Sequence, residues 1–342
     1  MMWTSDKTLD VVLYALVSYT LGHILSCFGL MSFWTVFIVT WILSAGTCLY
    51  LASLEISPGK KAVIVTGCDS GFGHEIALKL DKLGFRVFAG CLLADAGGEG
   101  AKDLRKKGSE RLHVLQMDVT SSEQLDKALE VVEKLLPDDE VLWGIVNNAG
   151  IAYMGAVEWV PLKDFKTSTE VNYLGLVAAT KTFLPLIRRS KGRVVNISSL
   201  VGGLAVLWFS PYIGTKYAVE GFSDCLRLEM RKFGVKVSLI EPSSYIAATQ
   251  LLTKEMLTRQ ADSCWEGLSE EIRSAYGEET FRQSFEGYMN HGERNIQPVV
   301  DAVTEALTQM HPRARYCPST WPFKRMLLVA RHLPEWVYDA IF

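Results

Sequence analysis

The first part of the chain is continuously apolar, whereas the remainder alternates short apolar runs with amphipathic stretches. From Val11 to Leu54 the sequence contains no Asp, Glu, Lys or Arg, and this length is about twice the ~20 residues that a helix needs to cross a bilayer. We therefore expect residues 1–57 to form a helical membrane segment with two spans, Val11–Leu30 and Ser32–Leu54. One long tilted span, or one span followed by an interfacial segment, would fit the same pattern.

From residue 58 onward the hydrophobic pattern is that of buried strands separated by helices. Such alternation predicts an α/β fold, with a doubly wound parallel sheet of the Rossmann type. The chain of 342 residues is long enough for one such domain beside the membrane segment. The expected strands are 61–65, 86–91, 112–117, 143–147, 193–197 and 235–240, and the expected helices begin at Phe72, cover 122–136, end near Ile187 and cover 212–233.

Charge and cysteine content narrow the class of protein. Lys and Arg number 35 against 38 Asp and Glu, without a basic block, so nothing in the sequence indicates a nucleic-acid partner. The 7 cysteines are scattered, with no C-x-x-C motif and no Cys/His ligand spacing. This distribution favours a reducing compartment and argues against a bound metal.

Ser199, Tyr212 and Lys216 form a pattern with a chemical meaning. Tyr212 and Lys216 are four residues apart and therefore share one helix face. Because a phenol has a pKa near ~10, a tyrosine that exchanges a proton with an alcohol needs help to ionise, and the Lys216 ammonium would favour the phenolate. Ser199 follows the strand 193–197, where its hydroxyl can hydrogen-bond the reacting oxygen. We interpret the three residues as the proton-transfer groups of an oxidoreductase.

A glycine-rich turn between a predicted strand and a predicted helix is the second chemical signal. Thr66-Gly67-x3-Gly71-x-Gly73 directly follows the strand 61–65. Glycines let a pyrophosphate approach the backbone, and the N-terminus of the next helix stabilises its charge. The turn therefore predicts a dinucleotide site, although its spacing is not G-x-G-x-x-G.

Together these motifs resemble the short-chain dehydrogenase/reductase family over roughly residues 60–317. The matches are the glycine turn, Asn147-Asn148-Ala149-Gly150, Asn172, Ser199, Tyr212 and Lys216, in this order. The resemblance implies catalysis by Asn172, Ser199, Tyr212 and Lys216, and it implies that Asn172 holds a water linking Lys216 to solvent. Asn147 to Gly150 would stabilise the central sheet, and Asp118 would hydrogen-bond the adenine ring. The implied cofactor-binding residues are Thr66, Gly67, Asp69, Ser70, Gly71, Phe72, Gly73, Asp118, Asn148, Ala149, Gly150, Tyr212, Lys216 and Pro242.

Within the family, the chain looks most like the membrane-associated branch that contains D-3-hydroxybutyrate, retinol and 17-beta-hydroxysteroid dehydrogenases. The glycine loop Gly67–Gly73 is similar to that of the branch as a whole. Three other stretches, Phe183–Arg189, Ser223–Arg227 and Ile246–Thr249, are most similar to the hydroxybutyrate enzyme.

NAD is the expected cofactor. Cys91 ends the second strand, where NAD-preferring relatives often carry an aspartate for the ribose hydroxyls. A 2′-phosphate would need Arg or Lys, yet residues 87–101 contain neither, and Asp69 and Asp95 would repel it. One departure concerns the nicotinamide end, because Ser243 stands where the family usually has glycine. Its Cβ could restrict the backbone there.

The expected substrate is a lipophilic alcohol or ketone. A hydroxy acid would need a cation or several donors for its carboxylate, but the loop Leu200–Pro211 contains no basic residue. Such a loop suits a steroid or retinoid, with Ser199, Trp208 and Tyr212 in contact with it. The loop could instead pack under a lid or against a second subunit of a homo-oligomer. D-3-hydroxybutyrate is the alternative substrate, and a catalytically silent membrane scaffold or NAD sensor is a further alternative.

The outer segments also carry expectations. The family builds a substrate lid after the last central strand, here 243–295, although a solvated helix pair would show the same pattern. The segment 318–342 mixes aromatic and basic residues, which suits contact with membrane lipid or docking onto the catalytic domain, 58–317. Lys60 and Lys61 favour a cytosolic catalytic domain. We expect the endoplasmic reticulum membrane, with a mitochondrial membrane as the alternative.

Overall fold

The computed structural model describes residues 5–287 and 292–342, and its contacts divide the chain into two units. The first unit contains the chain up to Ser57 and Thr308–Arg313, and the second contains Pro58–Leu307 and Ala314–Phe342. Thr308–Arg313 therefore groups with the N-terminal segment, which corrects its expected place in the catalytic domain. In the first unit, the backbone N–H of Ile56 donates to the carbonyl of Thr308 at 2.7 Å.

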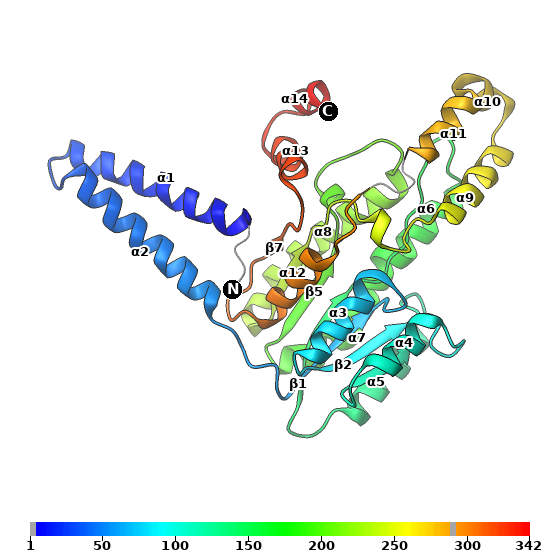
Figure 1. Cartoon of the computed structure of the whole chain (residues 1–342), viewed down its shortest axis with the longest axis horizontal. Helices are drawn as coiled ribbons and strands as arrows, with labels where there is room; N and C mark the ends of the chain where they lie inside the picture. The colour runs from blue at the N-terminus through cyan, green and yellow to red at the C-terminus, as the bar shows by residue number, and fades with distance from the viewer. Residues whose placement is uncertain (1–4, 288–291) are drawn as a thin grey trace. The chain divides into compact units, whose positions relative to one another are not determined.

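Two apolar helices make up most of the first unit, and they lie side by side as a hairpin (Figure 1). They are α1 (Ser5–Cys27) and α2 (Phe33–Ser53). The indole Nε1 of Trp41 donates to the carbonyl of Val11 at 3.2 Å, which ties one helix to the other. Both helices are long and apolar enough to cross a bilayer. Of the arrangements compatible with the sequence, the structure has the one with two helices.

A parallel sheet of seven strands forms the centre of the second unit, in the order β3-β2-β1-β4-β5-β6-β7. The direction of strand addition reverses between β1 and β4, and ligands of doubly wound sheets bind at this point, beyond the carboxyl ends of the strands. The predicted fold class is thus confirmed, and β7 is an addition to it. The strands are β1 (Lys61–Thr66), β2 (Arg86–Cys91), β3 (Leu112–Gln116), β4 (Val141–Asn147), β5 (Arg193–Ile197), β6 (Lys236–Ile240) and β7 (Arg315–Tyr316).

Helices connect the strands, and their ends follow local sequence signals. The Ser121 hydroxyl accepts a hydrogen bond from the backbone N–H of Gln124 and caps α5, while Pro211 lies in the first turn of α8. The apolar faces of the helices pack on the sheet, and side chains from both layers, such as Phe183 of α7 and Phe88 of β2, are fully buried. These helices are α3 (Gly71–Lys82), α4 (Glu99–Lys107), α5 (Ser122–Leu135), α6 (Leu162–Thr169), α7 (Leu176–Arg189), α8 (Ser210–Met230) and α12 (Gln297–Thr308).

Two groups of short helices lie outside this frame. The segment predicted to form a lid contains α9 (Lys254–Gly267), α10 (Glu270–Tyr276) and α11 (Glu278–Glu286), and its apolar face is buried around Phe281. These helices are amphipathic, which fits both readings of the segment, and the lid stays a prediction. The C-terminal segment forms α13 (Trp321–His332) and α14 (Glu335–Ile341), and Leu327 of α13 packs against the loop that follows β5. Of the two readings of this segment, docking onto the catalytic unit is observed.

Candidate active site

The glycine turn that follows β1 is packed tightly against the segment that follows β4. Gly67 and Gly71 have φ values of +68° and +59°, a region that favours glycine. A Cβ on Gly67 would lie 2.7 Å from the Cα of Ala149. A Cβ on Gly73 would lie 2.3 Å from the Gly67 carbonyl oxygen and 2.5 Å from Nδ2 of Asn148. The backbone conformation and the close packing therefore both require glycine at this turn.

Hydrogen bonds join the same two segments. The Thr66 hydroxyl accepts from the backbone N–H groups of Asn148 and Ala149, both at 3.0 Å. The Asn148 side chain donates to the carbonyls of Thr66 and Gly67, also at 3.0 Å. One strand further along, the Asn147 amide donates to Asn196 on β5 at 2.8 Å. The ends of β1, β4 and β5 are thus fixed relative to one another at the switch point of the sheet.

Two carboxylates, those of Asp69 and Asp118, line a cavity that the glycine turn also borders. The Asp69 carboxylate accepts from the backbone N–H groups of Leu92 and Leu93 at 2.8 and 3.0 Å, and so holds the turn after β2. Oδ1 of Asp118 accepts from the N–H and hydroxyl of Thr120 at 2.9 and 2.7 Å. Both carboxylates keep their place beside the cavity through bonds to the backbone. Their negative charge disfavours a further phosphate.

A cation also lies near the end of β2, outside the stretch considered from the sequence. Nη2 of Arg105, on α4, donates to the carbonyl of Ala94 at 3.5 Å, and its charge opposes the burial that raises the pKa of Cys91 to about 12. Arg105 does not line the cavity. Residues 87–101 do not include this cation, because the chain returns to the strand end one helix later.

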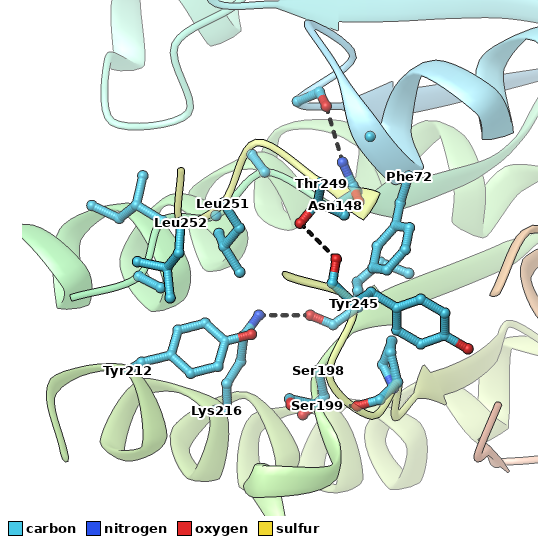
Figure 2. Close-up of a pocket in the computed structure, with 18 of the residues that line it drawn as sticks. Phe72, Asn148, Ser198, Ser199, Tyr212, Lys216, Tyr245, Thr249, Leu251 and Leu252 are labelled. Carbon is cyan, nitrogen blue, oxygen red and sulfur yellow. Dashed lines mark hydrogen bonds between the residues drawn. The ribbon is translucent and has the colours of Figure 1, made fainter. Parts of the chain in front are cut away.

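Ser199, Tyr212 and Lys216 meet at the carboxyl end of β5. Tyr212 and Lys216 extend from α8 into the same part of the cavity (Figure 2), with the Lys216 nitrogen 5.3 Å from the centre of the Tyr212 ring. The Lys216 ammonium donates to the carbonyl of Ile197 at 2.9 Å, which fixes the end of its flexible side chain. Ser199 lies two residues after the end of the same strand, and the hydroxyl, phenol and ammonium border a common space.

Asn172 supports this group from behind and does not line the cavity. It lies in a π-helical turn, Glu170–Gly175, a rare geometry that is frequent at functional sites. Its side chain exchanges hydrogen bonds with the backbone of Ile151 at 2.8 and 2.9 Å and donates to the Thr215 hydroxyl at 3.1 Å. Asn172 therefore joins the segment after β4 to the helix that carries Tyr212.

Burial shifts both titratable groups of the pair. It raises the pKa of Tyr212 to about 12, and a hydrogen bond with Ser199 opposes the rise. It lowers the pKa of Lys216 to about 8, and the Glu220 carboxylate one helical turn away opposes the fall. At neutral pH, Tyr212 accordingly holds its proton and Lys216 keeps its charge. The tyrosine is poised as an acid, and it needs added positive charge nearby to act as a base.

A cavity of about 580 Å³ connects the glycine turn with this pair. Lys216 is the one lysine or arginine among the described residues that line it. The walls around Ser199 and Tyr212 are mainly apolar and come from segments far apart in the sequence. These wall residues are Ile151, Ala152, Leu200, Val201, Leu204, Val206, Phe209, Tyr245, Ile246, Leu251, Leu252, Phe323 and Met326.

Most of the residues predicted for the site line this cavity, with Thr66, Gly73, Asn172 and Trp208 as the exceptions. Thr66, Gly73 and Asn172 lie behind its surface and shape it. Trp208 requires a correction. It has φ +70°, and its ring stacks on Trp159 at 4.8 Å with an interplanar angle of 9°. It thus belongs to the apolar cluster beneath the lid and does not contact the cavity.

Two cavity residues lie in a segment that sequence reasoning did not connect with the site. Phe323 and Met326 come from α13, more than a hundred residues after the Tyr212 helix begins. Their apolar character was visible in the sequence, but only the fold brings them to the cavity. Ser243 also lines the cavity, and it is not among the residues with positive φ. The Cβ that replaces the usual glycine hydrogen therefore causes no strain of that kind.

A glycine turn joined to a Ser/Tyr/Lys group at the switch point of a doubly wound sheet is the site of an oxidoreductase. Residues 61–260 match the profile of the family described as short chain dehydrogenase. The chain belongs to this family, as its motifs predicted.

Proteins and structures with known names agree with the branch that the motifs indicated. D-beta-hydroxybutyrate dehydrogenase, mitochondrial, from Bos taurus is 46% identical over 302 residues, which cover 87% of this chain and 88% of that protein. Retinol dehydrogenase 7 from Rattus norvegicus is 40% identical, with coverage of 82% and 87%. The 17-beta-hydroxysteroid dehydrogenase type 6 from Bos taurus is 37% identical, with the same coverage, 82% and 87%. A short chain dehydrogenase/reductase from Burkholderia phymatum in complex with NAD has the same fold, with a TM-score of 0.62, 22% identity and coverage of 81% and 93%.

Proposed function

We propose that the protein is an NAD-dependent dehydrogenase that interconverts a lipophilic alcohol, of the steroid or retinoid type, and the corresponding ketone or aldehyde. The observation that carries this proposal is the cavity itself. It places Ser199 and Tyr212 against apolar walls, and Lys216 is the one basic side chain among its described lining residues. A buried carboxylate without a partner is costly, so this wall favours a neutral, apolar substrate.

The groove leading to the catalytic pair fits a dinucleotide. The Cβ-free surfaces of Gly67 and Gly71 and the N-terminus of α3 would hold the pyrophosphate. Asp118 would lie at the adenine, and Asn148 to Gly150, Pro242 and Lys216 would hold the nicotinamide end. When bound, NAD supplies the hydride acceptor and a positive ring. Asp69 and Asp118 disfavour a 2′-phosphate, which supports NAD over NADP.

The protein's own groups account for the proton. The Ser199 hydroxyl donates a hydrogen bond to the substrate oxygen and holds it beside the Tyr212 phenol. In alcohol oxidation the phenolate of Tyr212 takes the hydroxyl proton, and in ketone reduction the phenol returns it. The Lys216 ammonium stabilises the phenolate. Asn172 keeps the Tyr212 helix in register with the segment after β4 through Thr215 and Ile151.

A second candidate is D-3-hydroxybutyrate, which the 46% identity with the bovine hydroxybutyrate enzyme favours. A short acid would have to hold its carboxylate with neutral donors or with Lys216. Gln250 of the lid lines the cavity and offers one such amide. Its single side chain is a weak substitute for a cation, since charge-assisted bonds are about twice as strong as neutral ones.

A panel of alcohols tests the proposal. The purified full chain in detergent should reduce NAD with steroid alcohols or retinol, and it should reduce NADP at least tenfold more slowly. Tyr212→Phe is the matched control, since it should bind NADH and not turn over. Activity confined to 3-hydroxybutyrate would overturn the lipophile proposal. NADH binding without turnover on any substrate would favour a silent sensor instead.

The two apolar helices support attachment to a membrane. We place the protein in the endoplasmic reticulum membrane with its catalytic unit in the cytosol, because Lys60 and Lys61 follow the second helix. The name of the hydroxybutyrate relative favours the mitochondrial alternative. Fractionation of cells that express a C-terminally tagged chain, followed by protease protection, tests compartment and orientation together. Cross-linking in the same membranes tests for a homo-oligomer.

A further inference from the structure

The C-terminal helix α13 forms one wall of the active-site cavity. Phe323 and Met326, three residues apart on α13, both line it. Leu327 of the same helix is 7% exposed and packs in one apolar cluster with Leu200 and Leu204 of the loop after β5. That loop also lines the cavity, so α13 and the loop form a single apolar surface.

Polar contacts fasten this helix to the catalytic unit. Nη2 of Arg331, at the end of α13, donates to the Glu241 carboxylate at 2.8 Å. The guanidinium crosses directly over Gly203, where a Cβ would lie 2.6 Å from its nitrogens. Farther along, the Tyr338 hydroxyl of α14 donates to the carbonyl of Ala205 at 2.8 Å. These contacts join the C-terminal segment to the loop after β5 at Gly203 and Ala205, and to the residue after β6 at Glu241.

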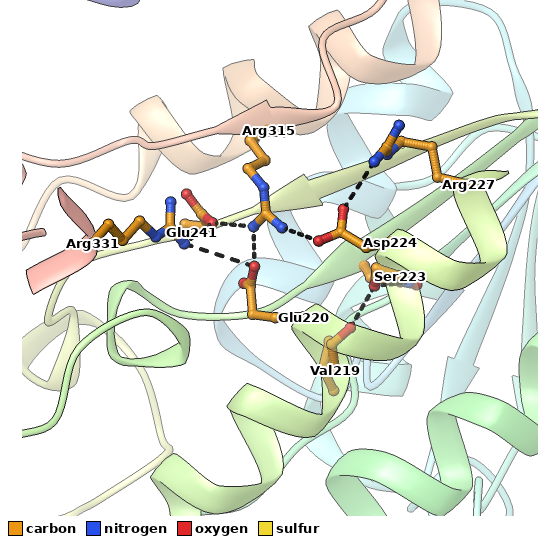
Figure 3. A network of polar contacts seen from close by, with 9 residues as sticks. Val219, Glu220, Ser223, Asp224, Arg227, Glu241, Arg315 and Arg331 are labelled. Carbon is orange, nitrogen blue, oxygen red and sulfur yellow. Dashed lines mark hydrogen bonds and ion pairs between the residues drawn. The ribbon is translucent and has the colours of Figure 1, made fainter. Parts of the chain in front are cut away.

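The anchoring carboxylates lie next to catalytic elements. Glu241 directly precedes Pro242, a cavity residue, and Glu220 lies one helical turn after Lys216. Arg315 of β7 pairs with both carboxylates and with Asp224, so the anchor is a network and not one ion pair (Figure 3). Because this network is partly buried, it holds its geometry better than an exposed pair would.

We propose that α13 is the specificity-determining wall of the active site, with Phe323 and Met326 contacting the part of the substrate remote from the reacting carbon. Arg331 is a positioning residue that sets the distance between α13 and the loop after β5. The proposal rests on the proposed function, since it assigns the far end of the lipophilic substrate to α13. The size of the substrate accepted then depends on two side chains outside the lid.

Trimming the wall should lengthen the preferred substrate. We compare the full-length parent, Met326→Ala and Phe323→Ala on 2-alkanols from 2-butanol to 2-dodecanol with NAD. Each variant should move the optimum of kcat/KM at least two carbons longer, with a gain of about fourfold for each extra buried methylene. Neither variant should gain activity on 2-butanol, because its chain is too short to fill the space that the substitution opens.

A matched control separates this effect from general loosening of the helix. Leu328 lies on α13, is 44% exposed and does not line the cavity, so Leu328→Ala should leave the optimum unchanged. NADH affinity and melting temperature are measured for every variant, and Phe323→Leu replaces any alanine variant that does not fold. An optimum that moves no further in Met326→Ala and Phe323→Ala than in Leu328→Ala would overturn the proposal.

The positioning role of Arg331 has its own readout. Arg331→Met should raise KM for the longest alkanols about fivefold with kcat preserved, and Arg331→Lys should restore part of the loss. Arg325→Met, at an exposed position of the same helix, is the control. Equal KM values in Arg331→Met and the control would remove Arg331 from the account.

Failure of the proposed function would give a different result. If the parent oxidises 3-hydroxybutyrate and no alkanol, the lipophile assignment falls, and the wall is tested on 3-hydroxy acids of increasing length. An optimum that shifts in Met326→Ala on that series supports the wall by itself. An optimum that stays fixed in both variants on the series that the parent oxidises refutes the wall.

Discussion

The two halves of the cavity are built by different means. The dinucleotide half is held by close backbone contacts and hydrogen bonds among Thr66, Gly67, Gly73 and Asn148. The substrate half is held by apolar side chains from the lid, the loop after β5 and α13. Close backbone contacts of this kind tolerate only glycine, whereas apolar packing tolerates many side chains of similar volume. Substitutions should therefore abolish function in the first half and adjust it in the second.

The largest effect is expected where the two halves meet. Tyr212→Phe removes the proton carrier and keeps the ring, so kcat should fall by about 10²–10⁴-fold. NADH affinity should change by less than about twofold, because the dinucleotide half is untouched. Stopped-flow turnover and NADH fluorescence titration measure the two quantities. Turnover within tenfold of the parent would remove Tyr212 from its assigned role.

The next effect tests the intolerance of the dinucleotide half. Gly73→Ala places a Cβ 2.3 Å from the Gly67 carbonyl, and backbone cannot yield as a flexible side chain would. We expect NAD affinity to fall about a hundredfold or more, or the variant not to fold. Gly221→Ala is the control, since nothing lies within 4 Å of its Cβ in α8, and it should raise stability by about 0.5–1 kcal/mol. NADH affinity is measured by isothermal titration. Equal affinities for Gly73→Ala and Gly221→Ala would contradict the claim that the dinucleotide half does not tolerate substitution.

A smaller effect is expected from pH. Oxidation needs ionised Tyr212, whose pKa burial raises to about 12, so kcat/KM should rise with pH. Lys216, whose pKa burial lowers to about 8, loses its supporting charge above that value. The profile for alcohol oxidation should therefore rise by up to tenfold per unit below about pH 8 and flatten above it. In Lys216→Met the break near pH 8 should vanish, and a parent profile that falls between pH 6 and 8 would refute the assignment.

The smallest effect on activity is expected from Trp208→Ala. Trp208 stacks on Trp159 and does not line the cavity, so kcat/KM should change by about threefold or less. The loss of packing should instead lower the free energy of unfolding by about 2 kcal/mol. Thermal unfolding with and without NADH measures the second effect. A loss of tenfold or more in kcat/KM for a lipophilic alcohol, with unchanged stability, would restore Trp208 as a substrate contact.

The difference between the dinucleotide half and the substrate half also explains what could be predicted from the sequence. The glycine turn, Asn148 and the Tyr212/Lys216 pair depend on residue types at fixed spacings, and the strands alternate with helices in a regular pattern. The fold class and the family were therefore predicted correctly. The charge near the end of β2 could not be predicted in the same way, because Arg105 reaches this strand end from the next helix.

For the substrate half of the cavity, the sequence predicted that the walls are apolar but not which residues form them. The apolar character of the loop 200–211 was predicted, but its backbone conformation was not. Trp208 has φ +70°, and its ring stacks on Trp159 and does not line the cavity. The contribution of Phe323 and Met326 depends on how α13 docks. Apolar residues carry no spacing that would reveal which distant segment they meet.

The central claim is that an apolar cavity binds a lipophilic alcohol beside Tyr212. It is tested most directly by kcat/KM of the parent chain on 2-alkanols of increasing length, compared with 3-hydroxybutyrate. Each methylene buried in the cavity contributes ~0.8 kcal/mol, so kcat/KM should rise about fourfold per carbon until the cavity is filled. A value independent of chain length, with 3-hydroxybutyrate as the better substrate, would contradict the account.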